Sequence, residues 1–204
     1  LSRVRSALAP LPQRAALPDW EAELIRLRTT RTTTAADASA PADLWPLLTE
    51  RLRAVNGLAF STLADLVAYL VEQNCLHGYC DPTLYPKVRD AFPSTFTVET
   101  TFDRARHDDY KFGLTLAAGA IAETGTLILS DNTSSSRLGA LAPWVHIAAI
   151  SLADIHPDIS AAIAAFPKDP NLIWVTGPPK TADVEGILIE GVHGPGLQAA
   201  LLLA

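Results

Sequence analysis

Residues 57–80, GLAFSTLADLVAYLVEQNCLHGYC, contain a short apolar run, an amphipathic segment and a second short apolar run. In the amphipathic segment, Thr62 and Asp65 stand at the spacing of a capping box, in which side chains satisfy the first free backbone N–H groups of a helix. Residues 61–74 are therefore predicted to form a helix between two strands. This order of elements is typical of an α/β protein.

The rest of the chain continues this alternation. Strands are predicted at 95–100, 112–117, 125–130, 145–151, 171–177, 186–192 and 198–204, and helices at 82–92 and 157–166. We therefore expect an α/β fold with a mainly parallel sheet flanked by helices. The last strands follow one another without helices, so part of the sheet is expected to be mixed or antiparallel, and 186–192 is expected to be a buried strand.

Residues 1–56 differ in character, and we expect them to form an N-terminal helical arm with a linker. Residues 19–28 place apolar side chains at helical spacing, and residues 31–43 are rich in Thr, Ala and Ser, as linkers are. A further helix is expected at 44–55, ending at Asn56-Gly57, a pair that often closes helices. The predicted organisation is thus an arm at 1–56 and an α/β domain at 57–204.

Composition argues against several classes of protein. The formal net charge of −6 is opposite to the basic excess that a nucleic-acid surface needs. The sequence contains no apolar run long enough to span a bilayer, and its two cysteines are too few for an iron–sulfur cluster, which normally takes four thiolates. We expect a cytoplasmic protein with no metal and no cofactor on this chain. Because the chain starts at Leu1 and contains no Met, we also expect a longer gene product.

The stretch Glu123-Thr124-Gly125-Thr126 leads directly into a predicted strand. Glycine lets the backbone turn sharply or approach a ligand closely, because it has no Cβ. Glu123 is then a candidate nucleophile or general base, and the other three residues are candidate ligand-binding groups. A structural role stays open, in which Glu123 and Thr124 satisfy backbone donors of the turn.

A second polar loop follows the strand predicted at 171–177. In it, Gly177, Lys180, Thr181 and Asp183 are predicted to form an anion cradle, with Lys180 attracting a small carboxylate. Such loops bind ligands in α/β proteins where they follow the carboxyl ends of strands. The loop lacks the glycine spacing of a Walker A motif, and its two prolines lack backbone N–H groups. In the alternative interpretation, Thr181 and Asp183 cap a single helical turn.

Three of the histidines have distinct surroundings in the sequence. His193, in GVHGP, can act as an acid, a base or a ligand near neutral pH, or it can fix its loop through backbone hydrogen bonds. His146 lies inside the apolar run VHIAAIS and is predicted to be a core histidine. His107 stands among arginines and aspartates and is predicted to lie on the surface.

Three stretches carry a family likeness: AIAETGTLIL (120–129), LAPWVHIAAI (141–150) and TGPPKTADVEGILIEGVHGP (176–195). They resemble the LUD-domain proteins, specifically the lactate utilization protein C branch, and the resemblance covers residues 58–204. One departure is Pro179, where the family usually has Ser; the proline removes a hydroxyl and a backbone N–H. The resemblance implies a fold like that of the NagB, RpiA and CoA-transferase-like proteins. It also implies a part in the oxidation of L-lactate to pyruvate, beside partner proteins that carry iron–sulfur clusters.

We therefore expect a subunit or accessory protein of an L-lactate utilization system. It would bind a small carboxylate or phosphate between the two polar loops, act with iron–sulfur partners and form a homo-oligomer. One alternative is an autonomous CoA-transferase-like or sugar-phosphate isomerase-like enzyme that uses Glu123. Another is a structural oligomer, in which the two loops pack against each other and leave no cavity.

Overall fold

The computed structural model describes residues 41–133, 136–166, 169, 171–182 and 189–203. The chain divides into two compact units, residues 1–32 and 33–204, and all described residues belong to the second. The helices expected within residues 1–40 lie outside the described part of the chain.

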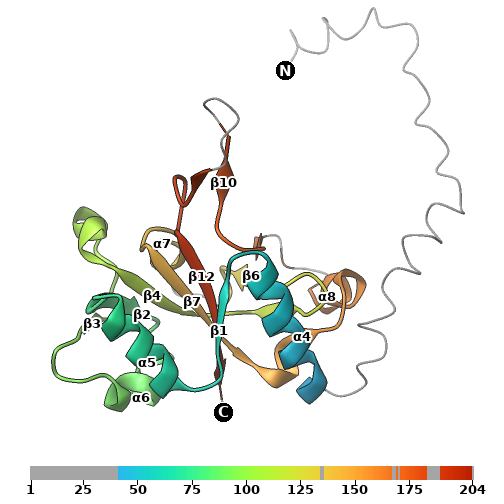
Figure 1. Cartoon of the computed structure of the whole chain (residues 1–204), viewed down its shortest axis with the longest axis horizontal. Coiled ribbons are helices and arrows are strands. Elements are labelled where there is room, and N and C mark those ends of the chain that lie inside the picture. The colour runs from blue at the N-terminus through green and yellow to red at the C-terminus, as the bar shows by residue number, and fades with distance from the viewer. Residues whose placement is uncertain (1–40, 134–135, 167–168, 170, 183–188, 204) are drawn as a thin grey trace, which may run out of the picture. The chain divides into compact units, whose positions relative to one another are not determined.

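A six-stranded parallel sheet forms the centre of the fold (Figure 1). Its strands lie in the order β1 (Leu58–Phe60), β12 (Leu197–Leu203), β7 (Val145–Ser151), β4 (Phe112–Leu116), β2 (His77–Cys80) and β3 (Thr97–Glu99). The last strand of the chain thus pairs with the first, Leu58 opposite Ala199, and with β7, Leu197 opposite Val145. The predicted α/β class and mainly parallel sheet are confirmed.

A second sheet of four strands contains β8 (Ile155–His156), β5 (Gly119–Ile121), β6 (Thr126–Ser130) and β9 (Leu172–Val175), in that order. Its β5–β8 pair is parallel and its other two pairs are antiparallel. The last strands were expected to be mixed or antiparallel. This is confirmed for β9, which pairs antiparallel with β6 in this separate sheet, and is wrong for β12, which is parallel to both of its neighbours in the central sheet.

Helices cover both faces of the central sheet. One face packs against α5 (Leu63–Glu72) and α6 (Tyr85–Val88), which is followed by the 3-10 turn η2 (Arg89–Ala91). The other face packs against α4 (Pro41–Ala54), α7 (Arg137–Leu141) and the second sheet. The 3-10 turns η3 (Arg104–Asp109) and η4 (Leu152–Asp154) connect strands, and α8 (Ile159–Ala165) packs on β5 and β6.

Two helices, α5 and α4, begin and end close to where the local sequence predicts, whereas α7 was not predicted. Thr62 accepts a hydrogen bond from the Asp65 N–H, and its hydroxyl donates to the Asp65 carboxylate over 2.7 Å, which confirms the capping box of α5. Helix α4 confirms the helix expected at 44–55, and Asn56, just beyond it, has a φ of 65°. Leu44, Leu48 and Leu52 of α4 are buried in the core. The core therefore includes residues on both sides of the boundary predicted between 56 and 57.

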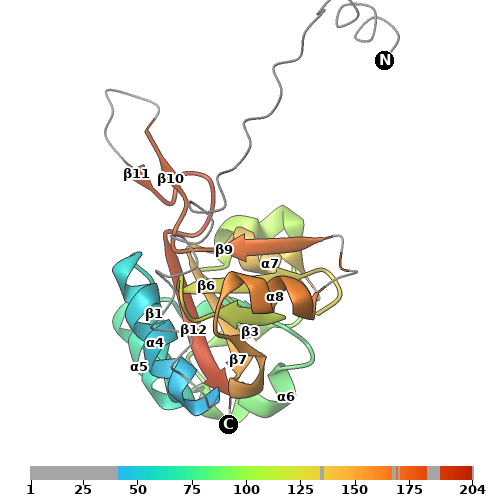
Figure 2. The same ribbon diagram turned by 90° about the vertical axis from the view of Figure 1, so that its right-hand side faces the viewer.

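The prediction of a buried strand at 186–192 is wrong for the described part of that stretch. Ile189–Glu190 (β11) pairs antiparallel with Lys180–Thr181 (β10), and the Ile189 side chain is 50% exposed. This two-stranded hairpin rises from the body of the domain in both ribbon views (Figures 1 and 2). An apolar run is buried only when a layer covers it, and neither larger sheet extends to this hairpin.

Candidate functional site

The Glu123–Thr126 stretch is the turn between β5 and β6, and it packs against α4. Gly125 has a φ of 67°, and a Cβ at this position would lie 2.5 Å from the Arg51 carbonyl carbon. The Glu123 N–H donates to the Pro157 carbonyl oxygen. Burial raises the pKa of the Glu123 carboxyl, the nearby Asp158 raises it further, and Arg51 opposes the change. The turn therefore has a structural role against α4, whatever else Glu123 does.

A chain of hydroxyls joins the two polar loops that the sequence analysis singled out. The Thr124 and Thr126 hydroxyl oxygens lie 2.6 Å apart, and those of Thr126 and Thr176 lie 2.7 Å apart. Gly177 follows with a φ of 76°, and a Cβ there would lie 2.3 Å from the Val55 carbonyl oxygen. Both loops thus pack against the C-terminal end of α4, at Arg51 and at Val55 just beyond it.

Lys180 is engaged in an ion pair at the base of the hairpin. Its ammonium lies 3.2 Å from the Glu190 carboxylate, which also accepts a 2.7 Å hydrogen bond from the Asn56 amide. The bonds from Asn56 and Lys180 lower the pKa of Glu190. The Lys180 charge therefore faces a carboxylate of the same chain. Thr181 lies beside it in β10, and Asp183 lies outside the described residues.

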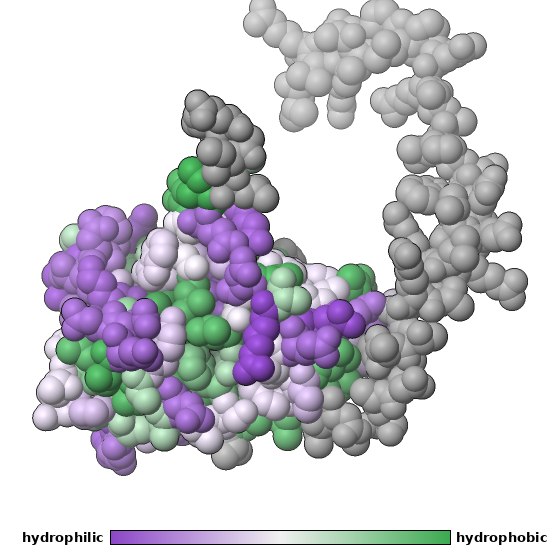
Figure 3. All heavy atoms as spheres, in the orientation of Figure 1, coloured by the Kyte–Doolittle hydropathy of each residue, from purple (hydrophilic) through white to green (hydrophobic). Residues whose placement is uncertain are grey.

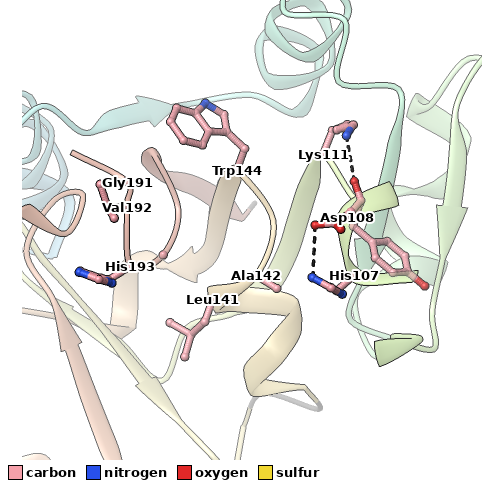
Figure 4. A pocket seen from close by; sticks show the side chains of 11 residues that line it. His107, Asp108, Lys111, Leu141, Ala142, Trp144, Gly191, Val192 and His193 are labelled. Carbon is pink, nitrogen blue, oxygen red and sulfur yellow. Dashed lines mark hydrogen bonds and ion pairs between the residues drawn. The ribbon is translucent and has the colours of Figure 1, made fainter. Parts of the chain in front are cut away.

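A cavity of about 360 Å³ lies at the amino ends of the central strands. We call it the Lys111 hollow; its main side chains are His107, Asp108, Lys111, Trp144, Val192 and His193. Figure 4 shows His107, Asp108 and Lys111 on one side of it and Gly191, Val192 and His193 on the other. Trp144 is 58% exposed at its edge. Three basic side chains, one acidic side chain and an exposed indole thus share this space.

The positions of these side chains follow from the order of the parallel strands. Lys111 immediately precedes β4, Trp144 immediately precedes β7, and His193 lies in the loop before β12. Because β4, β7 and β12 are neighbours, their preceding loops meet at one edge. The Lys111 ammonium donates to the Asp108 carbonyl oxygen over 2.9 Å, and His107 Nε2 lies 3.2 Å from the Asp108 carboxylate.

Glu99 holds the segment that carries His107 and Asp108. Its carboxylate accepts hydrogen bonds from the Arg106 guanidinium at 2.6 Å and from the Tyr110 hydroxyl at 2.9 Å. The Arg106 bond, followed by the Tyr110 bond, lowers the pKa of Glu99 to about 2. The carboxylate is therefore charged at neutral pH, and it fixes η3 against β3. His107 is exposed, which confirms the surface position predicted for it.

A second cavity of about 300 Å³ adjoins the first, with which it shares Leu141, His193 and Gly194. We call it the Gln198 hollow. Its walls include Leu141, Trp174, Pro178, Pro179 and Pro195, and its polar side chains are Thr176, His193 and Gln198. Gln198 is 1% exposed and accepts a 2.6 Å hydrogen bond from His146 Nδ1. Of the predicted site residues that the structure describes, Gly177 and His193 line this hollow.

His146 connects Gln198 to a third buried polar side chain. The Thr115 hydroxyl lies 2.9 Å from His146 Nε2, and all three side chains are buried. Burial lowers the pKa of His146 to about 4, against the opposing effect of the Gln198 bond, so the ring is neutral at pH 7. The prediction of a core histidine is confirmed. The sequence analysis did not select Gln198 or Thr115 as functional residues. Their signal in the sequence is that each is a single polar residue within an apolar run.

Glu123, Thr124, Gly125 and Thr126 line neither hollow. Lys111 and Trp144, which line the first hollow, were not predicted as site residues. The only signal for them was their position directly before an apolar run. Identifying them would have required the strand order, which brings those runs together.

No group of three or more His, Cys, Asp or Glu that could hold a metal ion occurs among the described residues. Cys75 and Cys80 are both free and buried. Burial, with a smaller effect of Asp81, raises the pKa of the Cys80 thiol to about 12, and burial also raises that of Cys75. Within the same part of the chain, no helix is long and apolar enough to cross a membrane.

A model of the LUD domain matches residues 85–203, more than half of the chain. The chain belongs to the LUD-domain family. The matched residues include every side chain named above for the two hollows. The resemblance inferred from the three sequence stretches is thereby confirmed for this LUD domain.

Similar curated proteins bear the name lactate utilization protein C. The one from Bacillus licheniformis is 31% identical over 121 residues, which are 52% of this chain and 50% of that protein. The one from Bacillus subtilis is 33% identical over 100 residues, covering 45% of this chain and 42% of that protein. The one from Deinococcus radiodurans is 34% identical over 87 residues, which are 40% of this chain and 41% of that protein. This LUD domain thus aligns with about half the length of these relatives or less, and the likeness supports the expected branch.

A solved structure shares the fold. The crystal structure of a DUF162 family protein from Deinococcus radiodurans, at 1.70 Å resolution, superposes with a TM-score of 0.54 at 20% sequence identity. The superposition covers 81% of this chain and 99% of that one. At this identity the likeness concerns the fold of the LUD domain alone.

Proposed function

We propose that this LUD domain is part of a subunit or accessory protein of an L-lactate utilization system, in which it binds a small anionic ligand and acts beside iron–sulfur partner proteins. The observation that carries the proposal is its 31–34% identity to proteins named lactate utilization protein C. The Lys111 hollow supports the proposed binding of an anionic ligand, because its residues lie in the part of the chain that the LUD-domain model matches.

The Lys111 hollow has the chemistry of a site for a small carboxylate. Lys111 donates one N–H to the Asp108 carbonyl oxygen and has two further N–H groups to offer, and charge-assisted hydrogen bonds to carboxylates are the stronger kind. The volume of about 360 Å³ is in the usual range for small-molecule sites. Lys180, by contrast, is occupied by Glu190. We therefore place the anion at Lys111, across the hollow from His193, and not on the hairpin.

The partner part of the proposal rests on cysteine chemistry. A lactate-oxidising system needs an electron acceptor, and an iron–sulfur cluster normally takes four thiolates. This sequence has two cysteines, both buried and with raised thiol pKa values. We therefore propose that any iron–sulfur clusters of the system are carried by the partner proteins.

Calorimetric titration with L-lactate and with pyruvate tests the ligand site. We expect at least one of them to bind, and the Lys111→Gln variant to weaken that binding about tenfold, since a hydrogen bond to a charged group is lost. Lys87→Gln, which changes an exposed lysine on α6, is the matched control and should leave the affinity unchanged. Equal affinities of the Lys111 and Lys87 variants would contradict the placement of the anion.

Co-purification with the iron–sulfur proteins of a lactate utilization system tests the partner part. We expect a stable complex that elutes as one species in size-exclusion chromatography and carries the absorbance of the clusters. A folded, purified chain without measurable affinity for those proteins would overturn this part.

A second candidate is an autonomous CoA-transferase-like or sugar-phosphate isomerase-like enzyme, and the observation that favours it is the raised pKa of Glu123. A carboxyl with a raised pKa suits general acid–base work near neutral pH. The two functions differ in the effect of Glu123→Gln. This substitution should abolish turnover of acyl-CoA or sugar phosphate if Glu123 is catalytic, and it should leave lactate or pyruvate binding intact if our first proposal holds.

A further inference from the structure

Three adjacent strands of the central sheet each bury one polar side chain on the same face. His146 of β7 and Gln198 of β12 are direct partners in the register, and Thr115 of β4 lies diagonally across from His146. The three side chains form a continuous row, with 2.6 Å and 2.9 Å hydrogen bonds. Their neighbours on these strands are mostly Ala, Leu and Ile, so the row crosses an otherwise apolar core.

The row fixes the orientation of the Gln198 amide. The His146 ring is neutral, so it carries one N–H; Nδ1–H donates to the Gln198 amide oxygen, and Nε2 accepts from the Thr115 hydroxyl. His146 holds the Gln198 amide oxygen. The amide NH2 group of Gln198 is therefore left to face the hollow that this residue lines. Buried polar groups are costly unless they are hydrogen-bonded, so a donor held in this way favours a ligand that offers an acceptor.

The rest of the Gln198 hollow is mainly apolar. Leu141, Trp174, Pro178 and Pro179 form walls around the amide, and His193 stands where this hollow adjoins the Lys111 hollow. Figure 4 shows the His193 ring on the side away from His107 and Lys111. In the view of Figure 3, hydrophobic side chains gather near the centre of the domain, below the hairpin. A ligand with an apolar body, one acceptor oxygen and a carboxylate would match each of these groups.

We infer that the Gln198 hollow binds a 2-oxo carboxylic acid with an apolar side chain. The oxo group accepts from the Gln198 amide, the carboxylate lies toward His193, and the side chain packs against Trp174 and the prolines. The cavity of about 300 Å³ has room for a side chain larger than the methyl group of pyruvate. This inference rests on the proposed function only for the presence of a carboxylate. The oxo group and the apolar side chain follow from the hollow itself.

Two acids that differ only in the oxo group test this inference. In calorimetric titrations of the full chain, 4-methyl-2-oxopentanoate should bind about tenfold more tightly than 4-methylpentanoate, because only the first offers an acceptor to Gln198. Gln198→Leu should bring this ratio to about one while both acids still bind. Gln73→Leu, which changes an exposed glutamine at the end of α5, should leave the ratio as in the original chain.

A measurement on the unsubstituted chain keeps the test independent of whether the variant folds. In ¹⁵N-resolved NMR spectra, the Gln198 side-chain amide signals should shift during titration with the oxo acid and move much less with the acid that lacks the oxo group. The His146 ¹⁵N shifts should show a neutral ring protonated at Nδ1. Equal binding of the two acids, or unmoved Gln198 signals at saturation with the oxo acid, would overturn the inference.

The outcomes separate this inference from the proposed function. Suppose that lactate or pyruvate binds in a manner that depends on Lys111, while the two longer acids bind with equal affinity. This result would overturn only the role of Gln198. A tenfold preference for the oxo acid, in a chain that forms no complex with iron–sulfur lactate-utilization proteins, would support the inference and overturn the partner proposal.

Discussion

His146 is buried in the middle of the central sheet, yet its two ring nitrogens are both hydrogen-bonded. A neutral imidazole can satisfy one donor and one acceptor partner, and Gln198 and Thr115 supply them. Burial of the charged ring is unfavourable, which is why the pKa falls to about 4. The sequence alone predicted the burial of His146 but not its partners, which are 31 and 52 residues away along the chain.

This histidine should make the stability of the domain depend on pH in a defined direction. The folded-state pKa is about 4, below the ordinary value of 6.5, so between these values the unfolded chain binds the proton and the folded domain does not. The contribution of His146 is therefore full above about pH 6.5 and is lost as the pH falls toward 4.

Urea unfolding at pH 7 and pH 5 measures this effect. From pH 7 to pH 5 the free energy of unfolding should fall by about 2 kcal/mol more for the original chain than for the His146→Gln variant, which has no titrating ring. Identical pH dependence in the two chains would contradict this, because it would mean that the His146 pKa is the same in the folded and unfolded states.

At the scale of elements, the turn between β5 and β6 and the last turn of α4 are fitted to each other. Gly125 and Gly177 both have positive φ; Gly125 lies against the α4 backbone at Arg51, and Gly177 lies against the backbone of Val55, the residue directly after α4. The sequence indicated that Gly125 permits a close approach, but it suggested a ligand as the group approached. The group in contact is the chain's own helix, because α4 covers this part of the core.

Gly125→Ala should therefore destabilise the domain by more than about 2 kcal/mol, since it adds a Cβ at positive φ and within 2.5 Å of the Arg51 backbone. Gly194→Ala is the matched comparison, because its Cβ would lie 3.3 Å from the Pro179 ring and 3.9 Å from the Leu141 carbonyl oxygen, with no contact below 3 Å. We expect it to cost less than about 1 kcal/mol. Chemical denaturation of both variants measures the difference, and similar losses in the two would argue against the packing of this turn on α4.

At the scale of the whole described domain, α4 is part of the core. Leu44, Leu48 and Leu52 pack with residues of the central sheet and of the second sheet, in the same cluster as Ala148 and Leu127. The sequence assigned this helix to the N-terminal arm, because a Thr/Ala/Ser-rich stretch precedes it and Asn56-Gly57 follows it. Those signals mark the ends of a helix, but they do not say what its apolar face packs against.

Leu48→Ala should consequently lower the free energy of unfolding by about 3 kcal/mol, within the range for large-to-small changes in a core, and the domain should still unfold in one transition. Arg53→Ala, an exposed change on the same helix, should alter stability by less than about 0.5 kcal/mol. A loss below 1 kcal/mol for Leu48→Ala would mean that α4 does not belong to the core.

The sequence by itself determined most of the local elements and the family of this protein. Thr62 and Asp65 specify the start of a helix, apolar runs specify strands, and the stretches at 120–129, 141–150 and 176–195 identify a LUD domain, because all these signals lie between residues close together in the chain. Only the tertiary structure decided which loops meet. The pairing of β7 with both β12 and β4 brings Lys111, Trp144 and His193 to one edge and aligns Thr115, His146 and Gln198 inside the sheet. Such pairings join residues far apart in the sequence, and they depend on how whole faces of the sheet are covered, which no local pattern records.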